Sequence, residues 1–352
     1  MKRTAKGGGH RELARELGVS PTTVSLVLSG RAEHYRISAA TQRRIRARAA
    51  ARGWTPARNR RRRRTLLVGL PEKLHAVDRP GFVSEVLDPL THALAAEGWR
   101  ITMAPFTTDA PLGITPALLR EATAVLLPTT GDTERLVERI ARQALRHGIW
   151  PVILGRTYPG LDGIMVDGDQ EAGGRAAAAH LLDLGHRDIA VLPGRRGDRH
   201  SAERLRGFSG ECARRGCPLP GDRVWAAGDY WVIGAHEATF RRLGRGRRPT
   251  AIFYLCDAMA IGGFYAIRER GLRVPEDVSV IGYDDDRDAI RGLRPALTTI
   301  RVQVGDAGGR VARALVERAA GRGEAAPLTI RCPVRLVRRA STAMPRTHGG
   351  EA

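Results

Sequence analysis

Seven short apolar runs recur between residues 65 and 340, and they constrain the fold more than any other feature of the chain. They read TLLVGLP, ITMAPF, AVLLPT, PVILG, IAVLP, AIFYL and VSVIGYD. Amphipathic segments of helical length, such as residues 82–97 and 132–147, separate them. Because strands that alternate with helices form parallel, helix-covered sheets, this pattern predicts an α/β architecture. A chain of 352 residues is long enough for two such modules.

The first 64 residues have a different composition. They hold 18 of the 58 Lys and Arg residues but only 3 of the 37 acidic residues, in a chain whose net charge is +21. An arginine-rich codon bias contributes along the whole chain, yet it does not explain why acidic residues are so few before residue 65. A localised cationic segment is typical of a surface that binds a polyanion, and nucleic acid is the leading candidate.

The same segment contains the pattern of three short helices. Leu13, Ala14 and Leu17 share one helical face, Gly18 and Val19 form a turn, and a second apolar face follows in the segment 20–28. Ser20 suits the N-cap of the second helix, and Pro21 suits its first position. Ser38 can cap a third helix, whose inward residues are Ile45 and Ala49. Three short helices with a glycine-containing turn predict an all-α helix-turn-helix unit, whose second helix enters the DNA major groove.

Three strings in this unit carry a specific resemblance. GVSPTTVSLVLSG, then ISAATQRRI, then ARGWTP, are similar to the headpiece of the lac repressor and galactose repressor (LacI/GalR-type) family. The resemblance implies base contacts from Pro21, Thr22 and Leu26, and Leu26 can offer only an apolar contact such as one to a thymine methyl. It also implies contacts that carry no sequence information, mainly to phosphates, from Ser20, Thr23, Ser25, Ser29 and Tyr35.

The segment after Pro56 departs from the family pattern. The family has a short hinge helix with a leucine that wedges into the minor groove, whereas this chain reads ARNRRRRRT. Arg63 stands in the place of that leucine, and Arg60 and Arg61 precede it. A solvated linker and a contact to the DNA backbone are equally compatible with such a run. We assign residues 58–65 to an Arg-rich hinge, with the headpiece at 1–57.

The resemblance continues through the α/β region. AAHLLDLGHRDIAVLPG, SAERLRGF, PTAIFYLCDAMAIGG and LRVPEDVSVIGYDD resemble the family's second half, and LTTIRVQVGDAGGRVARAL resembles its crossover and dimer-side helix. The implied fold is a two-lobed, periplasmic-binding-protein-like domain at 66–340, followed by a disordered tail at 341–352. An effector cleft between the lobes is implied, with candidate residues Phe82, Arg156, Arg204, Tyr230, Trp231, Cys256, Asp257 and Asp284.

The candidate cleft residues have distinct expected roles. Arg204 is expected to grip ligand hydroxyls or a carboxylate, and Asp284 is expected to accept hydrogen bonds from hydroxyls. Tyr230 or Trp231 offers an apolar stacking face. Cys256 occupies the place of a common family asparagine, and a thiol is a poorer hydrogen-bonding partner than an amide. The effector class implied by the family is a sugar or a related metabolite.

Several other classes of protein fit the sequence less well. The four cysteines show neither a CxxC pair nor zinc spacing, so we expect no metal, no cofactor and a reducing compartment. The N-terminus lacks a secretory apolar segment and no apolar run spans a membrane, so we expect a bacterial cytoplasmic, nucleoid-associated protein. We find no P-loop, GxSxG or HExxH motif and expect no enzyme. The predicted function is a homodimeric, effector-controlled DNA-binding regulator on a pseudo-palindromic operator; the alternative is a solute sensor of the same fold without operator function.

Overall fold

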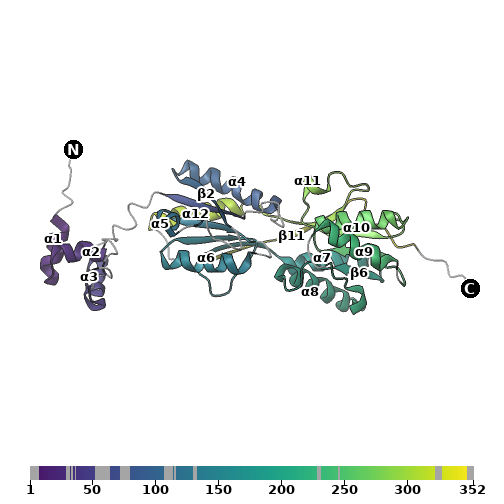
Figure 1. Ribbon diagram of the computed structural model, residues 1–352, viewed down its shortest axis with the longest axis horizontal. Coiled ribbons are helices and arrows are strands. Elements are labelled where there is room, and N and C mark those ends of the chain that lie inside the picture. Colours follow the sequence, from purple (N-terminus) through teal and green to yellow (C-terminus); the bar gives the residue numbers. More distant parts are fainter. Residues whose placement is uncertain are drawn as a thin grey trace, which may run out of the picture.

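Three short helices form the N-terminal unit of the computed structural model (Figure 1). They are α1 (Gly8–Leu17), α2 (Pro21–Leu28) and α3 (Ala39–Ala51). The structure describes residues 8–28, 32, 35, 37–51, 64–71, 80–106, 114, 116–129, 133–227, 231–244, 246–321 and 327–346.

The predicted local signals of this three-helix unit are confirmed. Gly18 adopts a φ of 65°, a left-handed conformation that favours glycine, and so permits the tight turn between α1 and α2. The Thr23 amide donates to Ser20 Oγ at 2.9 Å, and the Thr41 amide donates to Ser38 Oγ at 3.2 Å, so both serines cap their helices. The buried core consists of Leu13, Ala14, Val24, Val27, Leu28, Ala32, Ile45 and Ala49.

A six-stranded parallel sheet organises the first lobe, with strand order β10-β5-β4-β3-β1-β2. Its strands are β1 (Thr65–Pro71), β2 (Arg100–Phe106), β3 (Ala124–Pro128), β4 (Trp150–Leu154), β5 (Ile164–Gly168) and β10 (Leu328–Cys332). Its helices are α4 (Pro80–Ala96), α5 (Pro116–Glu121), α6 (Glu134–Arg146) and α12 (Ala307–Ala319).

Alternate side chains of the strands serve two cores, one on each face of this sheet. Leu66 and Val68 of β1 pack with the buried faces of α4 and α12, whereas Leu67 packs with α5 and α6. Successive strand residues point to opposite faces, so a strand covered by helices on both sides must be apolar throughout. This requirement explains the continuous apolar runs, and the predicted parallel α/β fold is confirmed.

The second lobe, which carries α7 to α11 in Figure 1, contains a five-stranded sheet. Its strand order is β11-β9-β8-β7-β6. The strands are β6 (Ile189–Leu192), β7 (Ala251–Tyr254), β8 (Ser279–Tyr283), β9 (Thr298–Val302) and β11 (Val334–Val337), and only β11 pairs in the antiparallel sense. The helices are α7 (Gln170–Asp183), α8 (Arg199–Arg214), α9 (Val232–Leu243), α10 (Asp257–Glu269) and α11 (Arg287–Ile290), with the 3-10 turn η2 (Gly221–Arg223).

The chain passes between the lobes after β5, after β9 and after β10 in its described part. These crossings contact one another, because the Gln303 amide donates to Pro333 O at 2.8 Å and the Asp169 amide donates to Cys332 O at 2.9 Å. A Cβ on Gly168 would lie 2.9 Å from a methyl of Val302, so the crossings are closely packed. The cleft between the lobes is therefore bordered by a hydrogen-bonded set of connecting segments.

Two predicted boundaries need correction, and some predictions fall outside the described residues. The predicted disordered tail is wrong for residues 341–346: Ser341 is fully buried, its Oγ donates to Val280 O at 2.6 Å, and the Ala343 amide donates to Ser279 Oγ at 3.0 Å. These backbone and hydroxyl groups pair with strand β8, so the segment is part of the second lobe. Thr65 belongs to β1 and not to the hinge. Ser29, Tyr230, Arg60, Arg61 and Arg63 lie outside the described residues.

Candidate functional site

The outward face of α2 carries the candidate DNA-reading residues. Val24, Val27 and Leu28 face the headpiece core, so the same helical geometry turns Pro21 and Thr22 to the surface. The residues Thr23, Ser25 and Leu26 are partly buried at the edge of this face. The Ser20 and Thr23 hydroxyls lie 2.8 Å apart, so both lie together at the start of α2. The structure thus brings the described members of the predicted α2 surface together.

Outside α2, the surface of the headpiece carries several exposed arginines and one exposed tyrosine. Arg43, Arg44, Arg46 and Arg48 are exposed on α3, a helix without acidic residues. Arg44 donates to the carbonyl of Leu17 at 3.4 Å, which places its guanidinium beside the turn that precedes α2. Tyr35, the remaining described candidate, is 53% exposed. This arrangement suits a phosphate backbone, because guanidinium groups bind phosphate oxygens without reading sequence.

A cavity of about 380 Å³ lies between the two lobes. Gly81, Phe82 and Glu85 of α4 line it from the first lobe, and residues 284–289 line it from the second. Arg301 of β9 contributes at the base of the loop. Two of the predicted cleft residues, Phe82 and Asp284, therefore line one cavity although they are far apart in the sequence.

The loop after β8 holds Asp284 in an unusual backbone conformation. Asp284 and Asp285 have φ values of 111° and 55°, in the left-handed region that non-glycine residues seldom adopt. The Asp284 amide donates to Ile300 O at 2.7 Å, which fixes the loop against β9. Such strain occurs where surrounding contacts enforce it, often at ligand sites. The loop directs a carboxylate toward the cavity instead of continuing the strand.

Arg204 lies beneath this loop and is only 2% exposed. Its Nε donates to Gln170 Oε1 at 2.9 Å, its Nη1 donates to Leu255 O, and its Nη2 donates to Asp284 Oδ1 at 3.3 Å. The guanidinium also stacks 3.6 Å above the centre of the Tyr283 ring. All three nitrogens have partners in the protein, so Arg204 positions Asp284 in this structure.

Two glycines determine where the helix that carries Arg204 lies. A Cβ on Gly174 of α7 would lie 2.0 Å from the Arg204 carbonyl oxygen, and a Cβ on Gly207 would lie 2.0 Å from the Glu171 carbonyl oxygen. Helices α7 and α8 are therefore in backbone contact at these positions, where no other residue fits. This close packing brings Arg204 within reach of Gln170.

Asp257 and Cys256 lie under the cavity and not on its surface. Asp257 is 1% exposed, accepts from Thr299 Oγ1 at 2.6 Å and from the Asp286 amide at 2.9 Å, and so supports the loop. Burial, followed by the nearby Asp284 carboxylate, raises the pKa of Asp257 well above its ordinary value. Cys256 caps α10, because the Met259 amide approaches its Sγ at 3.4 Å. Cys256 thus replaces an ordinary polar N-cap with a weaker acceptor.

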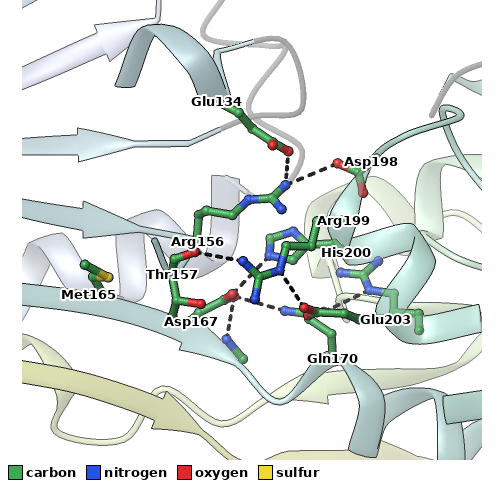
Figure 2. A network of polar contacts seen from close by, with 12 residues as sticks. Glu134, Arg156, Thr157, Met165, Asp167, Gln170, Asp198, Arg199, His200 and Glu203 are labelled. Carbon is green, nitrogen blue, oxygen red and sulfur yellow. Dashed lines mark hydrogen bonds and ion pairs between the residues drawn. The ribbon is translucent and has the colours of Figure 1, made fainter. Parts of the chain in front are cut away.

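Arg156, which follows β4, is buried in a polar network between the lobes (Figure 2). Its Nη2 forms ion pairs with Glu134 of the first lobe and with Asp198 of the second, the latter at 3.5 Å. Burial raises the pKa of Glu134, although the adjacent guanidinium opposes that shift. His200 and Asp167 complete the network, with Nε2 and Oδ2 3.1 Å apart.

Trp231 is the described member of the predicted aromatic pair. It is 46% exposed and precedes α9 as its N-cap residue. The stacking role that the sequence suggested for this indole stays a prediction. The cavity lining described above does not include it.

Several cleft residues escaped sequence reasoning. Arg301 donates to Glu85 at 2.6 Å and thereby joins β9 to α4, and Asp285 pairs with Arg339. Glu85 is one polar residue on an amphipathic helix and Arg339 lies far along the chain, so neither is distinguished by local pattern. Asp198 did have a signal, because it precedes α8 and its side chain accepts from the Ser201 amide at 2.7 Å as an N-cap.

His180 and His186 have structural roles in the second lobe. His180 Nε2 lies 2.9 Å from Thr342 Oγ1, and His186 Nε2 lies 2.8 Å from Ala343 O. Burial lowers the pKa of His180 to about 4 and also lowers that of His186. Both imidazoles are therefore neutral when they bind the C-terminal segment. Neither belongs to the lining of the cavity.

Among the described residues, no helix is both long and apolar enough to cross a membrane. The same part of the chain contains no group of three or more His, Cys, Asp or Glu side chains placed to hold a metal ion.

Comparisons with known proteins agree with this architecture. A family model for the periplasmic binding protein-like domain matches residues 178–342. The HTH-type transcriptional repressor PurR of Salmonella paratyphi B (strain ATCC BAA-1250 / SPB7) is 40% identical over 172 residues, which cover 49% of this chain and 50% of PurR. The chain thus spans about half the length of the curated relatives that it matches.

Solved structures match over more of the chain. A regulatory protein of the LacI family from Chloroflexus aggregans aligns with a TM-score of 0.68 and 26% identity, covering 79% of this chain and 98% of that one. The transcriptional regulator CelR in complex with cellobiose aligns with a TM-score of 0.67 and 25% identity, covering 96% and 100%. The lac repressor dimer bound to operator and the anti-inducer ONPF aligns with a TM-score of 0.65 and 24% identity, covering 97% and 100%, and shows the shared fold.

A three-helix headpiece joined to two α/β lobes with a cavity between them defines a protein of the periplasmic-binding-protein type with a helix-turn-helix unit. In its motifs and in these matches, the chain is similar to the lac repressor and galactose repressor (LacI/GalR-type) family.

Proposed function

We propose that the chain is a sequence-specific DNA-binding transcriptional regulator, acting as a repressor, whose operator affinity is controlled by a small molecule bound between its lobes. One observation carries the proposal: a helix-turn-helix unit with an exposed α2 face precedes a two-lobed domain that has an inter-lobe cavity. The repressor name of the PurR relatives supports the same class of function.

DNA binding is supported by the surface of the headpiece. Thr22 is exposed on α2 and can reach base edges, while the arginines of α3 can neutralise phosphates. Long-range attraction from residues 1–64 adds to both contacts, since 18 of the 58 basic residues lie there. A dimer would present two such units to a pseudo-palindromic operator.

Effector binding is supported by the cavity between the lobes. Its volume of about 380 Å³ is that of a small-molecule pocket, and Phe82 offers an apolar face opposite the Asp284 carboxylate. Carboxylates accept hydrogen bonds from hydroxyl groups, so a sugar or related metabolite is the proposed ligand class. CelR, a structural relative over nearly the whole chain, is a cellobiose complex.

We propose a homodimer that uses an apolar groove on the second lobe. The groove measures about 650 Å³; its apolar lining consists mainly of Ile261, Phe264, Tyr265 and Leu293, and charged residues such as Arg268 and Glu276 border it. Tyr265 is 53% exposed, which is unusual for a large aromatic residue away from an interface. A second copy of this chain is the proposed occupant, and the lac repressor, which shares the fold, is a dimer in its operator complex. Tyr265→Glu should yield a monomer in sedimentation velocity measurements.

The experiment that tests the function combines two assays on the full chain. Gel mobility shift with upstream DNA should show binding that weakens steeply with salt, and calorimetry with a sugar panel should identify a ligand that alters this binding. A chain that binds a sugar but no DNA would support the alternative, a solute sensor of the same fold. We propose no catalytic activity, and a cytoplasmic location beside the nucleoid.

A further inference from the structure

The first turn of α8 contacts the opposite lobe at three points (Figure 2). Asp198, which caps α8, lies 3.5 Å from Arg156 of the first lobe, and the two side chains are 3% and 4% exposed. Arg199 donates to the Thr157 carbonyl at 3.0 Å. His200 lies 3.1 Å from Asp167 at the end of β5. Three consecutive residues of the second lobe thus reach three separate groups of the first.

Arg156 is held firmly from its own side of the cleft. Glu134 at the start of α6 shares the Nη2 group of Arg156 with Asp198, so one guanidinium links a carboxylate from each lobe. Within the described part of the chain, the Nε and Nη1 groups of Arg156 are buried without hydrogen-bond partners. Buried polar groups of this kind oppose the closed arrangement, and the ion pairs favour it. The balance is therefore sensitive to the loss of a single charge.

We propose that residues 198–200 form a closure latch, in which the chain's own side chains bridge the two lobes and hold them together. Ligands of two-lobed proteins usually supply the contacts that bridge the lobes. Here the Arg156–Asp198 pair supplies such a bridge itself.

Helix α8 connects the latch to the cavity. Asp198 lies at its N-terminus, and Arg204, further along the same helix, donates to Asp284 in the cavity lining. A ligand that competes for Asp284 would alter the Arg204 contact and therefore the position of α8. This coupling, unlike the latch itself, rests on the proposed function, because it requires an effector in the cavity.

The variant that tests the latch is Asp198→Asn. Asparagine keeps the side-chain oxygen that caps the Ser201 amide at 2.7 Å, but it removes the charge that faces Arg156. We expect amide hydrogen exchange in segments 155–157 and 198–202 of the full chain to become at least about tenfold faster. The variant removes the carboxylate that the second lobe presents to Arg156, and the remaining partner, Glu134, belongs to the same lobe as Arg156. Small-angle scattering should show a larger radius of gyration.

The matched control is Asp183→Asn, which removes an ion pair with Arg215 between α7 and α8 inside the second lobe. It should leave exchange in segment 155–157 unchanged. Arg156→Gln should open the lobes as Asp198→Asn does, and the double variant should open them no further, because both changes break one pair.

The outcomes for the latch and for the proposed function are separate. If Asp198→Asn and Arg156→Gln both exchange as the wild-type chain does, with unchanged scattering, the latch is refuted whatever the DNA assay shows. If the variants open the lobes but the wild-type chain binds no DNA, the latch holds and the regulator function is wrong. If either variant loses its melting transition altogether, Arg156→Lys replaces it, because lysine keeps the positive charge but not the guanidinium geometry. Amide exchange in segment 155–157 of Arg156→Lys should then lie between the rates of the wild-type chain and of an opened chain. A rate equal to that of the wild-type chain, in a variant of reduced stability, would overturn the latch.

Discussion

The headpiece and the inter-lobe cleft use arginine in opposite ways. On α3, Arg43, Arg44, Arg46 and Arg48 are exposed to solvent, whereas Arg156 and Arg204 in the cleft are buried against carboxylates and carbonyl groups. Exposed guanidinium groups act through a field that salt screens, while buried ones act through fixed geometry that salt hardly reaches. The same residue type therefore serves attraction at one end of the molecule and positioning at the other.

The largest expected effect concerns the exposed arginines of the N-terminal segment and their contribution to DNA affinity. A fragment beginning at Thr65 lacks the cationic segment and should lose DNA binding by several orders of magnitude, since phosphate contacts dominate affinity. Gel shift at several salt concentrations measures this loss. The fragment should still melt cooperatively, which serves as the control for folding. Equal DNA affinity of fragment and full chain would show that our interpretation of the N-terminus is mistaken.

Arg204→Ala tests the positioning role of the buried arginines in the cleft. Removing one partner of a buried pair costs about 3–5 kcal/mol, because the groups left behind are desolvated and unpaired. Chemical denaturation should show this loss of stability. The variant should also lose its response to the effector, whereas the affinity of the headpiece for DNA should stay nearly intact. Arg206→Ala, two residues further on, removes an exposed pair with Glu171 and is the matched control. Equal stability of the two variants would contradict the positioning role of Arg204.

A buried histidine gives the second lobe a pH dependence. The pKa of His180 is lowered to about 4, below its unfolded value near 6.5, so the unfolded chain binds more protons between these values. The contribution of neutral His180 to the free energy of unfolding should be fully present above pH 6.5. It should fall by up to about 3 kcal/mol as the pH drops toward 4. Urea unfolding across this range measures the slope. His180→Gln should flatten it, and a wild-type slope in that variant would exclude His180 as the cause.

The smallest effect separates folding from DNA contact within the headpiece. Ser20→Ala removes the N-cap of α2 and should destabilise the headpiece by about 1 kcal/mol, seen as a lower melting temperature. Thr22→Ala, at an exposed position that caps nothing among the described residues, should weaken specific DNA binding without changing that temperature. If Thr22→Ala lowered the melting temperature as much as Ser20→Ala, the assignment of Ser20 to helix capping and of Thr22 to DNA contact would be wrong.

One sequence prediction remains open because it concerns residues outside the described part of the chain. With Arg63 in place of a leucine wedge, the protein should bend its operator less than a leucine-wedged relative, since a guanidinium does not fill an unstacked base step. Circular-permutation gel shift compares the wild-type chain with Arg63→Leu. Strong central bending by the wild-type chain would contradict this interpretation.

The sequence by itself determined the features that depend on near neighbours. Helix faces, the Ser20 and Ser38 caps, the Gly18 turn and the apolar strands follow from periodicity and from hydrogen bonds within a few residues, so pattern was sufficient. It also indicated that Phe82 and Asp284 share a site, through a resemblance and not through local chemistry.

Only the tertiary structure decided which cleft residues face the cavity and which support it. Arg204, Asp257 and Cys256 carry the expected motif, yet their partners come from Gln170, Thr299 and the first turn of α10. Glu85, Asp198 and Arg339 entered the site only because separate segments fold against one another. Contacts between residues far apart in the chain depend on how helices and sheets pack, and one-dimensional periodicity does not contain that information.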